Sequence, residues 1–512
     1  MLRGVSGSTP SFPVWASRSR GLALVTSAAL ASSCGGGTGP APSADALHVG
    51  ATGVVITVGD TLRLGATIRE GRTTYSTVVP LTAAPWPTRF PARWTSADDR
   101  VARTGTDGLV TAAAPGATRV TLEAAGLRDT ASVLVRATDD TAGLAARAVS
   151  AGAGFTCALT PVGEAACWGS GWAGELGSGV ARLFTAVLSA ARVAGGLRFT
   201  ALDAGGQHAC GIATEGEAYC WGDDLYGQLG TGRVEVAEAV PARVDGGHRF
   251  RVLSAGNALT CGITVDGAVL CWGKAVVRGD GSREPSPAAV ALPGPGTFTT
   301  VSVGHEHACA LRDDGAAYCW GNNVYGQLGA VGASNPSGPT PVAGAHRFRS
   351  ISAGTAHTCA VDDAGAAFCW GANWDGRLGT GDETASPTPV PVAGGLRFAS
   401  ISAGLGHTCG VTGDGAAYCW GRNAQGELGA GAVPLVAGGD GRSLTPARVD
   451  GLAAVDSVTA GPGEHTCAVA GGIVYCWGAN GGGALGEGTL YRVATAGGRA
   501  LRTTPVRAAP LR

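Results

Sequence analysis

The stretch AGTAHTCAVDDAGAAFCWGANWDGRLGTG, residues 353–381, contains the pattern that decides the fold of this chain. In it, Cys359 follows His-Thr, and Cys369, ten positions later, precedes Trp-Gly. The pattern recurs seven times at spacings of 48 to 58 residues. Each unit holds four strand-like runs, as in PVPVAGG, RFASISAG, HTCGV and AAYCWG within 389–421. A period near fifty with four strands is typical of a β-propeller blade. The sequence therefore predicts an all-β fold with a seven-bladed propeller over residues 144–512.

The composition of the 512-residue chain agrees with many short strands. Glycine contributes 86 residues without a collagen-like period, so these glycines are expected in turns. With 45% hydrophobic and 15% charged residues, the chain has the composition of a folded protein. Its net charge of −1 gives no long-range attraction to nucleic acid, so we expect no nucleic-acid partner.

The first residues predict an export signal. A short apolar run, GLALVTSAALASSC (21–34), follows three arginines and is about as long as the hydrophobic core of a signal peptide. Residues 34–44 then have the composition of a flexible linker. This arrangement resembles a bacterial lipoprotein signal, which implies removal of residues 1–33 and lipidation of Cys34. The alternative is a plain secretory signal cleaved near Ala31. We therefore expect an outer-membrane or cell-surface lipoprotein, or otherwise a secreted or periplasmic protein, that touches the membrane only through its lipid.

In an exported protein, an even and regularly spaced set of cysteines predicts disulfides. In units one to six, a three-residue loop with glycine in third place sets two cysteines directly opposite each other in a hairpin. In unit seven the cysteines are nine apart, and the two-residue turn Gly471-Gly472 restores their opposition. We therefore expect one disulfide in each unit: Cys157–Cys167, Cys210–Cys220, Cys261–Cys271, Cys309–Cys319, Cys359–Cys369, Cys409–Cys419 and Cys467–Cys476.

Histidine stands two positions before the first cysteine in five units, which raises the question of a metal site. These residues are His208, His307, His357, His407 and His465. Zinc requires four converging ligands, whereas one unit offers one histidine and two cysteines. Phe155 and Leu259 replace the histidine in units one and three. We therefore expect structural histidines bound by neighbouring backbone, with no metal and no other cofactor.

Residues 45–138 predict a second, smaller β domain. Short strand-like runs alternate with turn signals at Asp107-Gly108 and Pro115-Gly116, which fits an immunoglobulin-like β-sandwich. The phrases WTSADDRVA (94–102) and GLVTAAAPGATRVT (108–121) resemble the bacterial immunoglobulin-like group 2 (BIG2-like) family. The residues that carry this resemblance are Trp94, Ser96, Asp98, Val101, Gly108, Val110, Pro115, Gly116 and Val120. The resemblance implies a spacer or an adhesive module, and we expect a spacer.

The phrases that follow Trp-Gly in the repeats point to a known propeller family. They read GDDLYGQLG (222–230), GNNVYGQLG (321–329), GANWDGRLG (371–379) and GRNAQGELG (421–429). Together with ISAGxxHTC before two of them, they resemble the regulator of chromosome condensation (RCC1-like) repeat, which implies a seven-bladed propeller. The array begins on a second strand and ends, at TTPVRAAPLR (503–512), on a first strand. We therefore expect the C-terminal strand to complete a blade and close the ring.

The family resemblance implies two further activities, which we keep open as less favoured possibilities. The eukaryotic founder of the family is a nuclear exchange factor for a small GTPase that also docks on nucleosomes, and a secreted bacterial relative inhibits β-lactamases. An exported, disulfide-bonded chain does not meet the partners of the founder, so we carry over the fold and not the exchange activity.

The sequence favours a non-catalytic binding function. No HExxH, GxSxG, Walker loop or dinucleotide fingerprint appears in a suitable context, so we predict no catalytic residues. We expect a monomeric, surface-anchored scaffold that recognises a protein or glycan through propeller-face loops. The variable loop at 278–296 supplies the binding candidates Arg278, Arg283 and Glu284. The alternative is a secreted enzyme acting on cell-wall or extracellular polysaccharide, which would need two converging carboxylates.

Overall fold

The computed structural model describes an all-β protein. The described residues are 46–49, 53–57, 61–63, 66–70, 73–76, 84–85, 91–105, 109–114, 116–136, 143–180, 183–274, 278–282, 284–332, 336, 338–431, 441–488 and 501–510. Apart from short helical turns such as η1 (Trp374–Gly376), their regular structure is β-strand. None of the described helices has the length and apolar character needed to cross a membrane. The predicted signal peptide, Cys34 and the linker lie outside the described residues.

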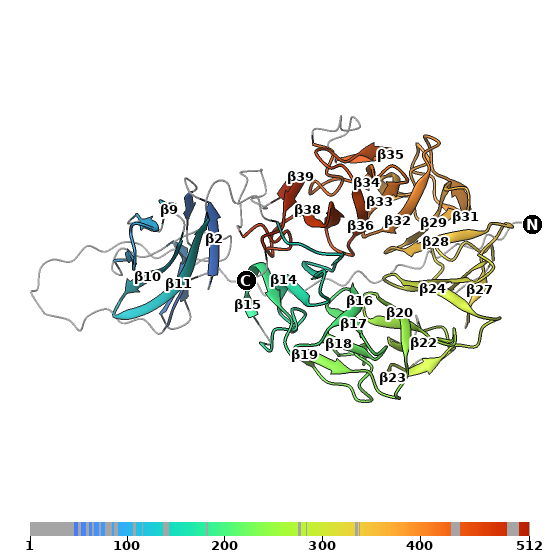
Figure 1. Cartoon of the computed structure of the whole chain (residues 1–512), viewed down its shortest axis with the longest axis horizontal. Coiled ribbons are helices and arrows are strands. Elements are labelled where there is room, and N and C mark those ends of the chain that lie inside the picture. Colours follow the sequence, from blue (N-terminus) through green and yellow to red (C-terminus); the bar gives the residue numbers. More distant parts are fainter. Residues whose placement is uncertain are drawn as a thin grey trace, which may run out of the picture. The chain divides into compact units, whose positions relative to one another are not determined.

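In the described part of residues 148–507, seven four-stranded antiparallel sheets follow one another around a ring (Figure 1). Blades 1 to 3 contain β12 (Ala148–Ala151), β13 (Phe155–Leu159), β14 (Ala165–Gly171), β15 (Leu183–Arg192); β16 (Phe199–Ala204), β17 (His208–Ala213), β18 (Ala218–Asp223), β19 (Ala237–Arg243); and β20 (Phe250–Ala255), β21 (Leu259–Thr264), β22 (Val269–Gly273), β23 (Ser286–Ala291). Blades 4 and 5 contain β24 (Phe298–Val303), β25 (His307–Arg312), β26 (Ala317–Gly321), β27 (Thr340–Pro341); and β28 (Phe348–Ala353), β29 (His357–Asp362), β30 (Ala367–Gly371), β31 (Ser386–Pro391). Blades 6 and 7 contain β32 (Phe398–Ala403), β33 (His407–Thr412), β34 (Ala417–Arg422), β35 (Arg442–Arg448); and β36 (Val455–Ala460), β37 (His465–Ala470), β38 (Ile473–Ala479), β39 (Leu501–Arg507). We call the four strands of a blade A, B, C and D in this order, from the centre of the ring outward.

The B and C strands pair in the register that the sequence predicts. In blade 5, Cys359 lies opposite Cys369, and Trp370 lies opposite Thr358. A large residue thus packs beside a small one across the hairpin. The tryptophan of this position is completely buried in every blade, where it packs in the cores between sheets: Trp168, Trp221, Trp272, Trp320, Trp370, Trp420 and Trp477.

Each B–C hairpin carries a disulfide. The seven cysteine pairs named above are bonded in the structure, with Cα atoms 4.1 Å apart in each pair. All fourteen cysteines are inaccessible to solvent. Closing a loop of about eleven residues stabilises the folded state by at most ~3 kcal/mol for each bond.

Because these sulfur atoms are buried, a thiol reductant should reach them only after a blade opens. We expect the native protein to resist dithiothreitol at neutral pH and to lose all seven bonds once guanidinium has unfolded it. Alkylation followed by mass spectrometry counts the free thiols in both states. Rapid labelling of the native protein would contradict the prediction.

The structural blades are offset by one strand from the units in the sequence. The run PVPV belongs to β31, which pairs with β30 of the preceding blade and not with β32 of the unit that it begins in sequence. The expected role of the C-terminal strand therefore needs correction. β39 is the outermost strand of blade 7, whose other three strands directly precede it in the chain.

The two ends of the array meet through backbone hydrogen bonds before β12 and after β39. The amide of Leu144 donates to the carbonyl oxygen of Ala508 at 2.9 Å. The amide of Ala508 donates to the carbonyl oxygen of Val474 at 3.0 Å. The amide of Val474 in turn donates to the carbonyl oxygen of Leu144 at 3.0 Å. β12 also packs against β36 and β37, so blade 1 follows blade 7 as any blade follows its neighbour.

The described residues between 46 and 136 form three small sheets. The first contains β1 (Ala46–Val49), β4 (Ala66–Glu70), β5 (Thr73–Ser76) and β6 (Ala84–Pro85); the second contains β2 (Gly53–Thr57), β11 (Leu127–Arg136), β10 (Gly116–Ala124) and β7 (Arg93–Ser96); the third contains β3 (Thr61–Arg63), β9 (Leu109–Ala112) and β8 (Ala102–Thr104). Trp94, Val110, Val120 and Val133 share a buried core. The β character agrees with the sequence, whereas the immunoglobulin-like arrangement, the BIG2 resemblance and the domain limits stay predictions.

Candidate binding face and central channel

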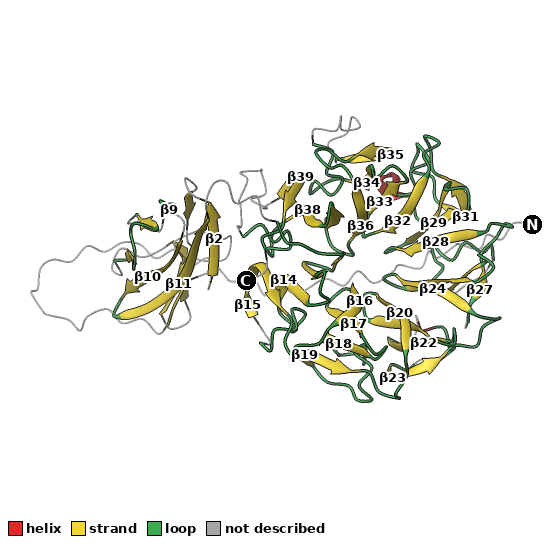
Figure 2. Cartoon of the chain, in the orientation of Figure 1, coloured by secondary structure: helices red, strands yellow, loops and turns green. Residues whose placement is uncertain are grey.

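Two kinds of loop lie on the same side of the propeller. Because the strands of a blade are antiparallel, the A–B and C–D loops emerge at one end of each sheet, and the B–C hairpins emerge at the other end. Figure 2 shows these loops around the ring of strands. We call the side with the A–B and C–D loops the loop face, and the side with the B–C hairpins the hairpin face. The mouth of the central channel opens among the A–B loops of the loop face.

Seven equivalent side chains line this channel near the ends of the A strands. They are Ser150, Asp203, Ser254, Ser302, Ser352, Ser402 and Thr459, and we call them the channel ring. Each member accepts a hydrogen bond from a backbone amide of the next blade, at 2.9–3.4 Å. Ser302, for example, accepts from Ala353 at 2.9 Å, and Thr459 accepts from Ala151, which completes the circle. The channel ring therefore joins every blade to its neighbour around a cavity of about 110 Å³.

Asp203 is the only carboxylate among the described residues that line the channel. Its Oδ1 accepts from the hydroxyl of Ser150 at 2.8 Å, and its Oδ2 accepts from the amide of Ala255 at 2.9 Å. Burial raises the pKa of the Asp203 carboxyl, and these hydrogen bonds partly oppose that rise. Hydrolysis of a glycosidic bond uses two carboxyl groups. The described lining of the channel supplies one such group, Asp203.

The A–B loops approach one another closely at the channel mouth. The amide of His305 donates to the carbonyl oxygen of Gly354 in the next blade at 3.2 Å. A Cβ at Gly304 would clash with this same oxygen, so the close approach of the backbone of the next blade requires glycine at this position. Gly354 and Gly404, which end the phrase ISAG, stand equally close to the next blade, since a Cβ there would lie 2.7 Å from the carbonyl oxygen of Gly404 and Gly461, respectively.

The five repeated histidines are buried at blade boundaries. His307 Nε2 lies 2.8 Å from the hydroxyl oxygen of Thr358 in the next blade, and this hydroxyl donates to the carbonyl oxygen of Gln327 at 2.8 Å. Since the only hydroxyl proton goes to the carbonyl, Nε2 must be the donor to Thr358. The other four pairs are His208–Thr260, His357–Thr408, His407–Thr466 and His465–Thr156. The expected backbone partner was therefore wrong, because the partner is a threonine side chain of the next blade.

Where a blade lacks the histidine, the next blade also lacks the threonine that would be its partner. Phe155 in blade 1 faces a blade with Ala209 at the threonine position, and Leu259 in blade 3 faces a blade with Ala308. Both apolar pairs lie in shared buried clusters. At these two boundaries an apolar pair replaces the histidine–threonine pair. Both residues change together because a buried Nε2–H without an acceptor would be costly. This paired replacement is visible in the sequence and was missed.

Burial dominates the protonation of these histidines. It lowers the pKa of His208 and His465 to about 4, and that of His307 and His407 to about 3. It also holds the pKa of His357 well below its usual value, with a further contribution from the nearby charge of Arg377. These side chains are therefore neutral at physiological pH.

The C–D loops carry exposed apolar side chains at equivalent positions in several blades. Blade 1 presents Trp172, blade 2 Leu225 and Tyr226, blade 4 Val324 and Tyr325, and blade 5 Trp374; each is 42–69% exposed. The corresponding residues are Ala424 and Gln425 in blade 6, and glycines in blade 7. Exposed aromatic side chains on a rigid framework are typical of binding surfaces.

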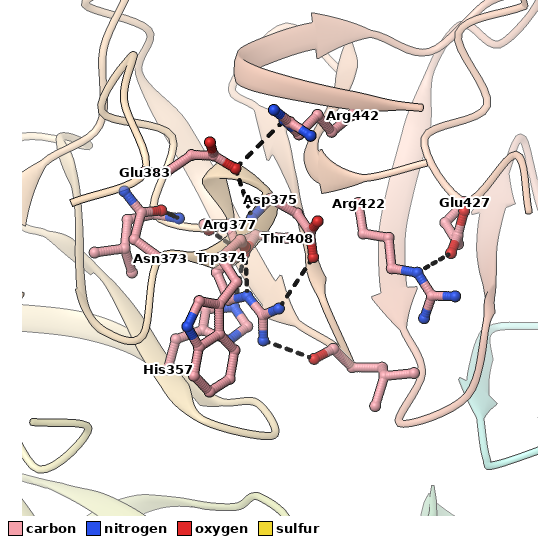
Figure 3. Close-up of polar contacts among 12 residues, drawn as sticks. His357, Asn373, Trp374, Asp375, Arg377, Glu383, Thr408, Arg422, Glu427 and Arg442 are labelled. Carbon is pink, nitrogen blue, oxygen red and sulfur yellow. Dashed lines mark hydrogen bonds and ion pairs between the residues drawn. The ribbon is translucent and has the colours of Figure 1, made fainter. Parts of the chain in front are cut away.

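A network of polar contacts fixes the C–D loop of blade 5 (Figure 3). Arg377 is almost completely buried, and its guanidinium donates to the carbonyl oxygens of Trp374 at 2.9 Å and Leu405 at 3.2 Å. It also pairs with Asp375 at 3.3 Å and lies 5.1 Å from the centre of the Trp374 ring. Since Leu405 belongs to the A–B loop of blade 6, Arg377 connects the exposed tryptophan to the rim of the channel.

The predicted binding loop of blade 3 is only partly exposed. Arg278 is 3% exposed, and its guanidinium pairs with Asp280 at 2.8 Å and donates to the carbonyl oxygen of Glu284 at 3.0 Å. Gly279 packs on Trp320 as Gly230 packs on Trp272, so Arg278 occupies the place of the buried Leu229. Arg278 is therefore a structural residue and not a binding residue. Glu284 is exposed, and Arg283 lies outside the described residues.

Comparison with known proteins identifies the family. The model of the RCC1-like domain matches residues 167–496, which is more than half of the chain. The chain belongs to the RCC1-like domain family. The repeated Trp-Gly phrases and the seven four-stranded sheets are the features that this family membership explains.

Two curated relatives of this RCC1-like chain share only part of it. The ultraviolet-B receptor UVR8 of Arabidopsis thaliana is 34% identical over 129 residues, which cover 24% of this chain and 29% of the receptor. The human E3 ubiquitin-protein ligase HERC2 is 36% identical over 123 residues, which cover 23% of this chain and 2% of the ligase. The chain thus matches less than a third of the length of either relative.

Solved structures of RCC1-like proteins share the fold. The protein Prp20p of Saccharomyces cerevisiae superposes with a TM-score of 0.60 at 24% identity, covering 67% of this chain and 85% of that one. Human WBSCR16 superposes with a TM-score of 0.55 at 22% identity, covering 61% of this chain and 84% of that one. At this level of identity the likeness concerns the fold alone.

Proposed function

We propose that this chain is an exported, non-catalytic binding protein that holds its ligand on the loop face of the propeller. The observation that carries the proposal is the set of exposed apolar side chains at equivalent C–D loop positions of blades 1, 2, 4 and 5. The seven disulfides and the closed channel ring support it, because they make the framework under these loops rigid. Buried disulfides in every blade also favour an oxidising extracellular compartment.

The proposal includes anchoring at the cell surface. The signal at 1–33 would be removed, Cys34 would carry the lipid, and the module at 45–138 would separate the propeller from the membrane. Replacing Cys34 with serine in the full chain should then move the protein from the detergent phase to the aqueous phase. Unchanged partitioning would favour a plain secretory signal.

A retention experiment with the full chain tests the binding function. The immobilised protein is exposed to extracts of the cell surface, and the retained protein or polysaccharide is measured. Leu225→Ser with Tyr226→Ser should lower retention about tenfold or more, because these side chains are among the proposed contacts. Val162→Ser is the matched control, because Val162 is 63% exposed in a B–C hairpin of the hairpin face.

Three outcomes would contradict the proposal. Equal retention by the loop-face variant and the control would remove the loop face as the binding surface. Release of soluble sugar from a polysaccharide that the protein does not retain would favour a secreted enzyme. Nucleotide exchange on a small GTPase, or inhibition of a β-lactamase, would favour one of the two activities that the family resemblance implies.

A further inference from the structure

We infer that Tyr325 and Trp374 form a stacking subsite for a neutral sugar ring, so that the ligand of the loop face is a polysaccharide. This inference rests on the proposed binding function and names its ligand class. The two aromatic side chains come from neighbouring blades 4 and 5. Their ring centres are 4.6 Å apart with the planes at 79°, and each residue is more than two-fifths exposed.

The subsite is held in place before any ligand binds. Arg377 lies against the Trp374 ring and is itself fixed by two carbonyl oxygens and Asp375. The amide of Tyr325 donates to the side chain of Gln327 at 2.9 Å, which fixes the neighbouring loop. Binding to side chains that are already ordered avoids much of the entropy cost of association.

The groups around the two rings select the ligand. Asp375 is one-third exposed beside Trp374, and Glu383 is 45% exposed. Through Oε1, Glu383 accepts from the amide of Asp375 at 3.2 Å and pairs with Arg442 at 3.3 Å, whereas its Oε2 has no partner among the described residues. Aromatic faces carry partial negative charge and attract C–H groups, and carboxylates accept hydrogen bonds from hydroxyl groups. A sugar ring offers both kinds of group.

The same surroundings disfavour other ligands. Asp375 and Glu383 each pair with an arginine, so the local charge is balanced and gives no net attraction to the phosphates of nucleic acids or the acidic groups of charged polysaccharides. The positive charge of Arg377 beside the Trp374 ring would repel a cationic ligand but not a neutral one. Protein interfaces bury about 800 Å² on each side and are depleted in charged residues at their centre. Here Asp375 and Glu383 stand directly beside the aromatic pair, which favours a sugar over a protein.

Repetition around the ring favours a polymer over a single sugar. Trp172 in blade 1 stands at the position of Trp374, and Tyr226 in blade 2 stands at the position of Tyr325. Further exposed aromatic side chains on one rigid face can engage further units of one chain, which raises the overall affinity without new kinds of contact.

The test measures sedimentation of the full chain with insoluble chitin, cellulose and plant-seed β-1,4-mannan, three neutral polysaccharides. We expect retention by at least one of them. Trp374→Ala should weaken this binding about tenfold or more, because the stacking surface is lost. Arg377→Gln should weaken it roughly three- to tenfold and leave the melting temperature within a few degrees, because glutamine stands at this position in blades 2 and 4. Val265→Ser, 64% exposed in a B–C hairpin of the hairpin face, should bind as the unmodified protein does.

The outcomes separate this inference from the proposed function. Retention of none of the three polysaccharides, or equal binding by Trp374→Ala and the unmodified protein, would overturn the inference. If the full chain instead retains a protein from surface extracts through Leu225 and Tyr226, the binding function stands and the sugar ligand is wrong. If neither kind of ligand is retained, both proposals fail.

Discussion

Acidification from about pH 7.5 to about pH 5 should destabilise the propeller, because five buried histidines must remain neutral for the blades to pack. In the unfolded chain a histidine titrates near pH 6.5. In the folded chain the pKa is about 4 for His208 and His465, and about 3 for His307 and His407. A pKa that is lower in the folded state leaves stability intact above pH 6.5 and removes it progressively as the pH falls toward the folded value.

The size of this effect is comparable to the whole stability of a typical domain. At pH 5 each buried histidine lowers the free energy of unfolding by about 2 kcal/mol relative to neutral pH. Five of them together approach the ~5–15 kcal/mol that separates most folded and unfolded domains. Guanidinium unfolding followed by tryptophan fluorescence at several pH values measures the loss, since all seven repeat tryptophans are buried.

Buried carboxyl groups act in the opposite direction and reduce the net loss. Burial raises the pKa of Asp224 to about 6, and it also raises that of Asp203 and Glu175. A carboxyl with a raised pKa stabilises the folded state below its unfolded pKa and loses this effect as the pH rises. On acidification to pH 5, Asp224 therefore raises the free energy of unfolding by about 1 kcal/mol, whereas each histidine lowers it by about 2 kcal/mol. Burial likewise raises the pKa of Asp223, Glu427 and Glu487, so these groups further reduce the net loss.

The chain itself offers a matched control for the histidine effect. His307→Leu with Thr358→Ala installs the apolar pair that Leu259 and Ala308 already form at another blade boundary. The double variant should lose about 2 kcal/mol less than the unmodified protein between pH 7.5 and pH 5. Identical pH dependence of the two proteins would show that this histidine does not control acid stability.

Removal of residues 501–512 should destabilise blade 7 and weaken its closure against blade 1. The deletion exposes the backbone of β38, which pairs with β39. It also removes Arg502, whose guanidinium lies 2.7 Å from the buried carboxylate of Glu487, and Ala508, which hydrogen-bonds to Leu144. The combined loss should be on the order of 5 kcal/mol, which lowers the melting temperature by roughly 10 °C in a protein of this size.

Calorimetry of two truncated proteins tests the closure. A chain that ends at Pro510 keeps β39, Ala508 and Ala509, and should melt as the full chain does. A chain that ends at residue 500 should melt earlier and aggregate, because an uncovered strand edge pairs with other chains. Equal melting temperatures for the two truncated proteins would show that the ends do not hold the ring together.

The hairpins could be predicted in detail because they are local. Once the loop length between Cys359 and Cys369 is known, the alternation of a strand fixes which residues face each other, and Trp370 must lie opposite Thr358. The shorter spacing between Cys467 and Cys476 likewise places these two residues opposite each other. Contacts within one unit thus follow from the sequence with little freedom.

Contacts between units were harder to predict because they depend on how one sheet stacks on the next. The partner of His307 is Thr358, some fifty residues away, and the channel ring links residues of different blades in the same way. The burial of Arg278 was missed because charge usually indicates exposure. Alignment on Gly279, which packs on Trp320, would have placed it at a leucine position. The exposed aromatic residues stand in the repeated phrase that follows Trp-Gly. They were missed because that phrase was interpreted only as a signature of the fold.

The offset of one strand between sequence units and blades has a consequence for how such a gene can lengthen. Tandem duplication of one unit would give three strands to a new blade and one strand, of the type of β31, to the blade before it. Because the inserted copy shares a sheet with the preceding blade, it cannot separate as an autonomous domain. Each added blade also brings one ring acceptor and one backbone amide, of the kind seen in Ser302 and Ala353, so the circle stays balanced.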